Sequence, residues 1–258
     1  MKKILITGGP TNEYIDEVMK ITNMSSGKIA IELAEKFVHG GYDTTLLITK
    51  GIKNPLIKDL EKNGCKVYNF ETTEELYKLL SYLSQEQYDV IIHSAAVADY
   101  KPEYSFRLED MATEIAKYIN DNKHLNEAEM EKLIFNILKN PDCKVNDDTK
   151  ISSVEPNLTV KLGLTPKIIK SLRDWYPNAY ICGFKLLENV PEEELVAAAM
   201  KQLESCQTDL VFANDLAELR KGNMSRLVIT SKGNTNIRVD GAEGIYTLIK
   251  IANFDFSE

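Results

Sequence analysis

The segment from residue 8 to residue 28 contains the residue types that bind phosphate groups. Two glycines follow a short apolar run, and a Ser-Ser-Gly-Lys sequence precedes apolar residues that recur at helical spacing. Backbone N–H groups, hydroxyls and a lysine at a helix N-terminus together favour an anion. An ordinary helix capped by Ser25 or Ser26 is an alternative that this segment alone leaves equally open. The candidate phosphate-binding residues are Gly8, Gly9, Ser25, Ser26, Gly27 and Lys28.

The same segment does not match the two common nucleotide-binding motifs. The sequence that begins at Gly8 lacks the G-x-G-x-x-G spacing of a dinucleotide site. A P-loop is also excluded, because Ile29 stands where Ser or Thr would follow the lysine, and Thr22 stands where the first glycine should be. We therefore predict a longer anion-binding loop that could hold a triphosphate.

Polar and small residues near this loop in the predicted fold could bind a substrate. The side-chain amide of Asn23 can donate to a carbonyl or phosphate oxygen, although such residues also stabilise turns. Asp99 ends an apolar strand, where it could bind a ribose hydroxyl, a substrate amide or a hydrated metal ion, or simply cap a turn. Ala95 and Ala96 have small side chains that would let a ligand approach the backbone or let a helix pack closely.

Two further residues have the chemistry that nucleotidyl transfer requires. Lys150 carries a mobile point charge suited to phosphate groups, and its alternative is a solvated lysine at a strand end. Phe184 could stack on a nucleobase or belong to the core. The histidines form no recognisable arrangement with a serine or cysteine nucleophile, so we do not expect triad chemistry. They are His39, His93 and His124.

Strands and helices alternate along most of the chain. This order predicts an α/β fold with a Rossmann-like, doubly wound, mostly parallel sheet flanked by helices. In such sheets ligands bind beyond the carboxyl ends of the strands, which places residues 8–9 and 94–100 on the same edge. The expected strands are 2–7, 44–49, 66–70, 88–93, 180–184 and 209–213, with a final hairpin at 227–230 and 237–239.

The region between residues 102 and 162 breaks this alternation. Residues 102–148 are rich in charge and contain two helical patterns, near 109–119 and 127–138, which indicate a helical insertion. Residues 150–154 and 158–162 alternate with period two around a turn, which predicts a β-hairpin arm over 150–162. We treat the whole chain, 1–258, as one domain.

Composition narrows the possible functions. The 258 residues include 27% charged and 43% apolar residues, and the net charge of −8 argues against a general nucleic-acid-binding surface. The cysteines are widely spaced and form no C-x-x-C pair, so neither a zinc site nor a disulfide framework is expected. No apolar run is long enough to span a bilayer, and no signal peptide precedes the first strand. We expect a cytoplasmic protein that binds neither nucleic acid nor membrane. The cysteines are Cys65, Cys143, Cys182 and Cys206.

Several short motifs, taken together and in this order, resemble those of the phosphopantothenate–cysteine ligases. They are 8–11 (GGPT), 15–16 (ID), 21–28 (ITNMSSGK), 95–100 (AAVADY), 150–151 (KI), 183–185 (GFK) and 209–215 (DLVFAND). The resemblance implies that a carboxylate attacks the α-phosphate of a nucleoside triphosphate and that the cysteine amine then displaces the nucleotide. It also implies a stand-alone bacterial form, CTP as cosubstrate, Mg²⁺ on the phosphates and a homodimer built through the hairpin arm.

The resemblance implies a role for each matching residue. Ser25 to Lys28, with Gly8 and Gly9, would surround the triphosphate. Asn23 would turn over the acyl-nucleotidylate, and Lys150 would act in its formation. The substrate side would consist of Asn23, Ala95, Ala96 and Asp99, and the nucleotide side would include Asp99, Lys150, Phe184 and Asn214.

Two departures from the family pattern affect this assignment. About fifty residues separate Asp99 from Lys150, where many members have a short loop. Cys206 and Gln202 or Lys201 stand where bifunctional bacterial enzymes offer basic residues to the nucleotide. An NAD(P)-dependent short-chain reductase is disfavoured by the missing G-x-G-x-x-G motif. A non-catalytic nucleotide-binding protein of the same fold remains an alternative.

Overall fold

The computed structural model describes residues 1–145, 150–152, 154 and 156–253. Within them the chain forms two compact units, where the sequence analysis expected one domain. The sheet unit comprises Met1–Thr11, Asn23–Val97 and the chain from Pro166 onward. The arm unit comprises Asn12–Thr22 and Ala98–Thr165.

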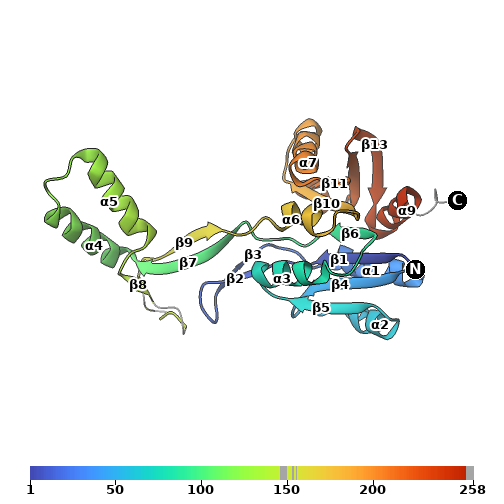
Figure 1. Ribbon diagram of the computed structural model, residues 1–258, viewed down its shortest axis with the longest axis horizontal. Coiled ribbons are helices and arrows are strands. Elements are labelled where there is room, and N and C mark those ends of the chain that lie inside the picture. The colour runs from blue at the N-terminus through green and yellow to red at the C-terminus, as the bar shows by residue number, and fades with distance from the viewer. Residues whose placement is uncertain (146–149, 153, 155, 254–258) are drawn as a thin grey trace. The chain divides into compact units, whose positions relative to one another are not determined.

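An eight-stranded sheet with the order β13-β12-β11-β10-β6-β1-β4-β5 forms the centre of the sheet unit (Figure 1). The strands from β11 to β5 in this order are parallel, and β12 and β13 add an antiparallel edge. The bounds are β1 Lys3–Gly8, β4 Asp43–Thr49, β5 Lys66–Phe70, β6 Val90–His93, β10 Tyr180–Leu187, β11 Leu210–Asp215, β12 Ser225–Thr230 and β13 Gly233–Asp240. The expected doubly wound sheet is confirmed.

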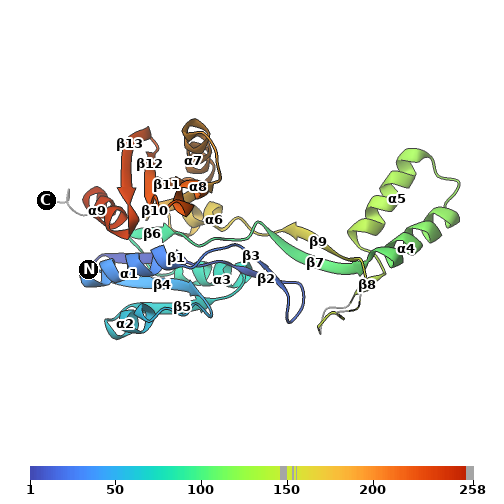
Figure 2. The same ribbon diagram turned by 180° about the vertical axis from the view of Figure 1, so that it is seen from behind.

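Helices cover both faces of this sheet. On one face, α1, α2 and α9 pack on Ile4 and Ile6, whereas α3 and α6 pack on Leu5 from the other face, where α7 packs on Val211. Figure 1 shows α3 on the near side of the sheet, and Figure 2 shows α1 there. Burial on both faces explains why the central strands are continuous apolar runs. The bounds are α1 Lys28–His39, α2 Leu56–Lys62, α3 Thr73–Leu83, α6 Ile168–Trp175, α7 Glu192–Cys206, α8 Leu216–Arg220 and α9 Gly241–Asn253.

The arm unit is built on a long antiparallel pair. Strand β7 (Tyr100–Arg107) pairs with β9 (Leu158–Leu164), and the short β8 (Lys144–Val145) lies on the other side of β7. The helices α4 (Leu108–Asp121) and α5 (Glu127–Lys139) form the expected helical insertion. They share a small core with β7. A further hairpin, β2 (Asn12–Tyr14) with β3 (Lys20–Thr22), belongs to the same unit.

The hairpin arm is present, but its strands differ from those predicted. Residues 150–152 and 154 lie outside strands, and residues 153 and 155 lie outside the described chain. Strand β9 pairs instead with β7, from Tyr100 opposite Leu164 to Arg107 opposite Leu158. The pairing of β9 with β7 is hard to predict from sequence, because Pro102 and a register shift next to it break the alternation of β7. The insertion therefore lies between the two strands of the hairpin rather than before it.

Candidate functional site

The N-terminus of α1 is shaped by a left-handed glycine. Gly27 is the N-cap with φ +68°, so neither Ser25 nor Ser26, which the sequence suggested as a cap, occupies that position. The two serines instead accept 3.4 Å hydrogen bonds through Oγ, Ser25 from the N–H of Gly27 and Ser26 from the N–H of Lys28. A glycine is favoured because φ is +68°, and a Cβ at residue 27 would in addition lie 2.8 Å from Ile48 Cδ1.

Gly8 and Gly9 bring the end of β1 against this helix start. A Cβ on Gly8 would lie 2.2 Å from Ala30 Cβ, so β1 and α1 approach more closely than any larger residue allows. Gly9 has φ +84°, and a Cβ there would lie 2.3 Å from Thr49 Oγ1. The same hydroxyl donates to the carbonyl of Pro10 at 2.6 Å. The ends of β1 and β4 and the first turn of α1 therefore meet at one point. The sequence predicted this position for the glycines and the helix start, but not for the end of β4.

Positive charge gathers at this point from two sources. The helix dipole directs its positive end toward the loop that contains the serines. Lys28 is exposed and lies 3.7 Å from Glu32, one turn along the helix, so its ammonium group can move to a ligand with little cost. The arrangement is suited to a polyanion such as a triphosphate.

Asn23 joins the loop to the segment after β6. Its Nδ2 donates to the carbonyl of Val97 at 3.0 Å and to that of Ala96 at 3.3 Å. The N–H of Ala96 in turn donates to the carbonyl of Gly9 at 2.9 Å. The structure thus brings Asn23, Ala95 and Ala96 beside the glycines, as predicted. The side-chain amide of Asn23 donates its hydrogen bonds to the backbone of residues 96 and 97.

A buried histidine supports the same segment. His93 Nδ1 and Thr7 Oγ1 share a 2.8 Å hydrogen bond, and the N–H of Ala95 donates to the same Thr7 oxygen at 3.3 Å. Burial lowers the pKa of His93 to about 4, so the ring is neutral at pH 7. Sequence reasoning considered His93 only as part of a triad and missed this positioning role. A histidine at the end of an apolar strand gives no sequence signal for this role, because its partner Thr7 lies on another strand.

Phe184 and Asn214 lie at the same edge of the sheet, on the face that α1 covers. The ring of Phe184 is partly buried and packs on Phe212, with centroids 5.2 Å apart. Asn214 is 8% exposed, at the end of β11. Gln202 and Cys206 belong to α7, on the opposite face, where a Cβ on Gly183 would lie 2.5 Å from Gln202 Nε2.

Asp99 and Lys150 belong to the arm unit, and both are exposed. The residue after Lys150 is fixed by Asp16, whose Oδ2 accepts a 2.9 Å hydrogen bond from the N–H of Ile151. Asp16 Oδ1 accepts from the backbone of Met19 and Val18 at 2.6 and 2.7 Å. Hydrogen bonds from Met19, Ile151 and Val18 lower the pKa of Asp16, and the charge of Lys150 acts in the same direction. Asp16 is a second positioning residue that sequence reasoning missed.

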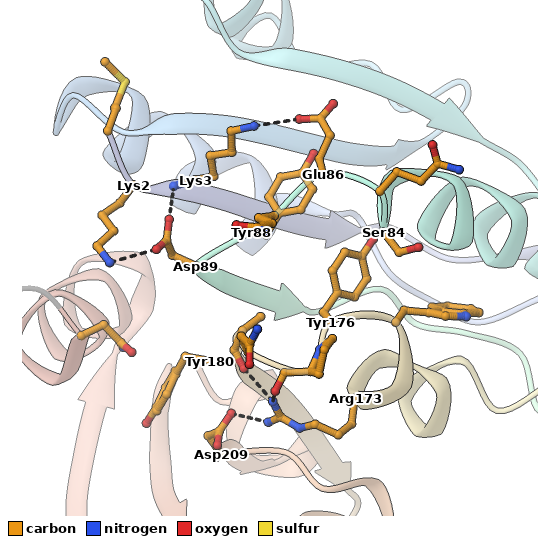
Figure 3. A pocket seen from close by; sticks show the side chains of 18 residues that line it. Lys2, Lys3, Ser84, Glu86, Tyr88, Asp89, Arg173, Tyr176, Tyr180 and Asp209 are labelled. Atoms are coloured by element: carbon orange, nitrogen blue, oxygen red, sulfur yellow. Dashed lines mark hydrogen bonds and ion pairs between the residues drawn. The ribbon is translucent and has the colours of Figure 1, made fainter.

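A wide cavity of about 1170 Å³ lies at the opposite edge of the sheet unit, at the amino ends of β1, β6, β10 and β11 (Figure 3). Its charged side chains pair with one another. The ion pairs are Lys2 with Asp89 at 2.9 Å, Lys3 with Glu86 at 3.2 Å and Arg173 with Asp209 at 2.6 Å. Because these cations already have carboxylate partners, the edge that contains Gly8 and Gly9 is the better candidate for an anion site.

The described ranges contain neither a candidate metal centre nor a candidate membrane span. No group of three or more His, Cys, Asp or Glu side chains there could hold a metal ion. No helix of the described chain is long and apolar enough to cross a membrane.

Comparisons with known proteins place this geometry in a family. A model of the DNA/pantothenate metabolism flavoprotein C-terminal domain matches residues 1–120. The coenzyme A biosynthesis bifunctional protein CoaBC of Thermococcus kodakarensis is 33% identical over 216 residues, which are 83% of this chain and 41% of that protein. Its counterpart in Methanocaldococcus jannaschii is 28% identical over 216 residues, or 84% of this chain and 41% of that protein. The chain therefore spans less than half the length of these curated relatives.

Solved structures extend the match to nearly the whole chain. The crystal structure of a DNA/pantothenate metabolism flavoprotein from Streptococcus pneumoniae is 30% identical, with a TM-score of 0.72 over 98% of both chains. A Cab2 variant in complex with phosphopantothenate-cysteine shares the fold, at 18% identity and a TM-score of 0.63 over 97% of this chain and 85% of that one. The chain belongs to the family of the DNA/pantothenate metabolism flavoprotein C-terminal domain, which confirms the resemblance to the phosphopantothenate–cysteine ligases.

Proposed function

We propose that the protein joins 4′-phosphopantothenate to L-cysteine in coenzyme A biosynthesis, with CTP as the activating nucleotide. The observation that carries the proposal is the contact between Asn23 and the backbone of Ala96 and Val97 beside the N-terminus of α1. The contact holds the uncharged backbone of Ala96 and Val97 next to the candidate anion site. Both surfaces belong to the sheet unit. A ligase that activates a carboxylate with a triphosphate needs these two surfaces side by side.

The N-terminus of α1 would bind the triphosphate. The N–H groups of its first turn and the hydroxyls of Ser25 and Ser26 are suited to phosphate oxygens, and Lys28 supplies a mobile positive charge. Mg²⁺ would bridge the phosphates and take most of its remaining ligands from water. Phe184 would stack on the nucleobase, and Asn214 would bind the same end of the nucleotide.

The chemistry consists of two displacements. The carboxylate oxygen of phosphopantothenate forms a bond to the α-phosphorus, and the bond to the β-phosphate oxygen breaks, which releases pyrophosphate and leaves an acyl-cytidylate. The cysteine amine then bonds to the acyl carbon, CMP leaves, and the amine loses a proton. Both steps depend on charge neutralisation and positioning more than on an acid or base of matched pKa.

Lys150 and Asp99 would act from the arm unit. We assign Lys150 to the first displacement, in which negative charge builds on the phosphates. We assign substrate binding to Asp99, as we do to Ala95 and Ala96. We assign Asn23 to the second displacement, because its side chain is held at the segment that would bind the acyl group.

We further propose a homodimer formed through the β7–β9 hairpin, acting in the cytoplasm. The hairpin exposes apolar side chains along both strands, which a second copy would cover. The exposed fraction is 52% for Tyr100, 41% for Leu162 and 71% for Leu164. Sedimentation analysis of the protein and of a Leu164→Glu variant would test this surface, since only a dimer through the hairpin should dissociate.

The first displacement can be tested alone. Incubation with CTP, Mg²⁺ and 4′-phosphopantothenate, without cysteine, should release pyrophosphate in an amount about equal to that of the enzyme. Addition of cysteine should then convert the bound acyl-cytidylate to 4′-phosphopantothenoylcysteine and CMP. A nucleotide-binding protein without activity would bind CTP and release no pyrophosphate, which would refute the proposal.

A further inference from the structure

Arg226, on β12, is a buried arginine whose hydrogen bonds are incomplete. Its side chain belongs to a residue that is 5% exposed. The guanidinium Nη1 donates to the carbonyl of Met224 at 2.9 Å, whereas Nε is buried with no hydrogen-bond partner in the described part of the chain. Burial lowers the pKa of Arg226, against the charges of Glu32 and Asp240, but an arginine remains charged at any physiological pH. A buried charged donor without a partner is costly and points to a missing acceptor.

The sheet register places Arg226 beside the expected nucleotide residues. Ala213 of β11 pairs with Leu227 of the antiparallel β12, so the next pair along these strands is Asn214 and Arg226. Residues on one strand alternate between faces, and Val228 belongs to the core that α1 and α9 cover. Arg226 therefore lies on the α1 face, at the edge where the candidate site lies. The charge of Glu32, on α1, acts on its guanidinium from the same side.

The order of strands indicates which end of a nucleotide would reach Arg226. From β1 the order runs β6, β10, β11 and β12, so at a strand spacing of about 4.8 Å the backbone of β12 lies roughly 19 Å from that of β1. Phe184 and Asn214 occupy the two intervening strands nearest to β12. A triphosphate at the start of α1 would thus place its ribose and base toward Arg226.

Glu32 offsets part of the positive charge of Arg226. Its carboxylate lies 3.7 Å from Lys28 Nζ, and its charge also acts on Arg226. What Arg226 lacks is therefore an acceptor for its buried Nε–H rather than a further counter-charge. A neutral nucleobase can supply such an acceptor.

We propose that Arg226 reads the nucleobase and selects cytosine over adenine and uracil. This inference rests on the proposed function and names the residue that sets its nucleotide preference. A guanidinium only donates hydrogen bonds, in a planar fork that matches two adjacent acceptors. Cytosine presents such a pair, N3 and O2, on one edge. Adenine presents an acceptor beside an amino donor, and uracil replaces the N3 acceptor with a donor, so neither satisfies the fork.

Two other arginines can be compared with Arg226, and one of them serves as a control for its replacement. Arg173 is satisfied by the carbonyls of Gln207, Pro177 and Ala179 and by Asp209, so it is a structural arginine. Arg238, on the adjacent strand, pairs with Leu227 across β12 and β13 and forms an ion pair with Glu192 at 2.5 Å. Because Leu227 faces the α7 side of the sheet, Arg238 carries the same charge on the opposite face. Arg238→Gln is therefore a matched control.

The test is the affinity for CTP and for ATP, each with Mg²⁺, measured by titration calorimetry without the other substrates. We expect the native protein to bind CTP more tightly, and Arg226→Gln to lose about tenfold or more in CTP affinity with little change for ATP. Arg226→Lys should lose most of the discrimination as well, because an ammonium group lacks the fork. Arg238→Gln should leave both affinities unchanged. Thermal unfolding of each variant checks that it is folded, and Arg226→Lys replaces Arg226→Gln if the latter does not fold.

Equal weakening of CTP and ATP by the Arg226 variants would show that the residue binds phosphate or supports the fold, and would overturn the inference. Unchanged affinities, or equal binding of CTP and ATP by the native protein, would overturn it too. None of these results depends on turnover. A protein that prefers CTP through Arg226 and yet releases no pyrophosphate would instead refute the ligase proposal and leave the base-reading role in place.

Discussion

Asp16 Oδ2 accepts a hydrogen bond of 2.9 Å from the backbone N–H of Ile151, the residue that follows Lys150. The contact ties residues that are far apart in sequence within the arm unit. It fixes the backbone from which the Lys150 side chain extends. The placement of Lys150 thus depends on a carboxylate in the loop between β2 and β3.

Replacement of Asp16 should therefore impair the first displacement. We expect Asp16→Ala to slow the pyrophosphate burst roughly 10- to 100-fold, because Lys150 would no longer be held in one position. Lys150→Gln should abolish the burst, since it removes the charge itself. Glu17→Gln, an exposed carboxylate next to Asp16, is the control and should not change the burst. Rapid-quench measurement of pyrophosphate tests all of these, and a normal burst in Asp16→Ala would exclude the positioning role.

Asn23→Asp should separate the two displacements. The substitution replaces the donor to the Ala96 and Val97 carbonyls with a carboxylate that repels them. We expect pyrophosphate to be released in a burst while amide formation falls by two orders of magnitude or more, about 3 kcal/mol of barrier. Mass spectrometry should find the acyl-cytidylate on the enzyme. Asn63→Asp, at the end of α2, should behave as the native protein, and normal product formation by Asn23→Asp would refute the role of Asn23.

Gly27→Ala should damage both the fold and the nucleotide site. The alanine would be strained at φ +68°, and its Cβ would lie 2.8 Å from Ile48 Cδ1, so the start of α1 or the Ile48 side chain must shift. We expect a loss of about 1–3 kcal/mol in the free energy of unfolding and at least tenfold weaker CTP binding. The control is Gly41→Ala. Gly41 also has a positive φ, +80°, but a Cβ there would meet no atom of the described chain within 4 Å. This variant should lose stability only, and equal effects on CTP binding would contradict the assignment of the site to α1.

His93 should make the protein sensitive to mild acid. The pKa of His93 is about 4 in the folded state and 6.5 in the unfolded chain. Between these two pH values the unfolded state binds a proton that the folded state does not bind. Stability is therefore constant above pH 6.5 for this group and falls as the pH drops toward 4. The loss at pH 5 is about 2 kcal/mol. Urea unfolding at pH 7 and pH 5 measures it. His93→Asn, which cannot titrate, should lack this loss, and an identical pH dependence would show that His93 is not buried as described.

The sequence predicts the sheet unit well because its strands are buried on both faces. Runs such as that of β1 are apolar at every position, and the helices between them have one apolar side, so type and order follow directly. The arm unit was harder to predict. β7 contains Pro102 and buries three successive residues, Tyr104, Ser105 and Phe106, so it has no alternating pattern. Its partner β9 does alternate and was therefore paired with the wrong segment.

The site residues divide along a similar line. The glycines, Asn23 and Phe184 can be named as candidates from sequence, because they lie at predicted strand ends or in the loop before a helix. His93, Asp16 and Arg226 could not be assigned their roles, since each depends on a partner distant in sequence. In the sequence Arg226 resembles an ordinary solvated arginine, and only the register of β12 places it beside Asn214.

The central claim, ligation driven by CTP, is tested most directly by the stoichiometry of multiple turnovers. The native protein would be incubated with CTP, Mg²⁺, 4′-phosphopantothenate and L-cysteine, and pyrophosphate, CMP and amide product would be measured together by phosphorus NMR and mass spectrometry. We predict equal amounts of all three, far above the amount of enzyme, and no product when any one substrate is omitted. Absence of product with both CTP and ATP, or conversion of the nucleotide to CDP and inorganic phosphate instead, would contradict the claim.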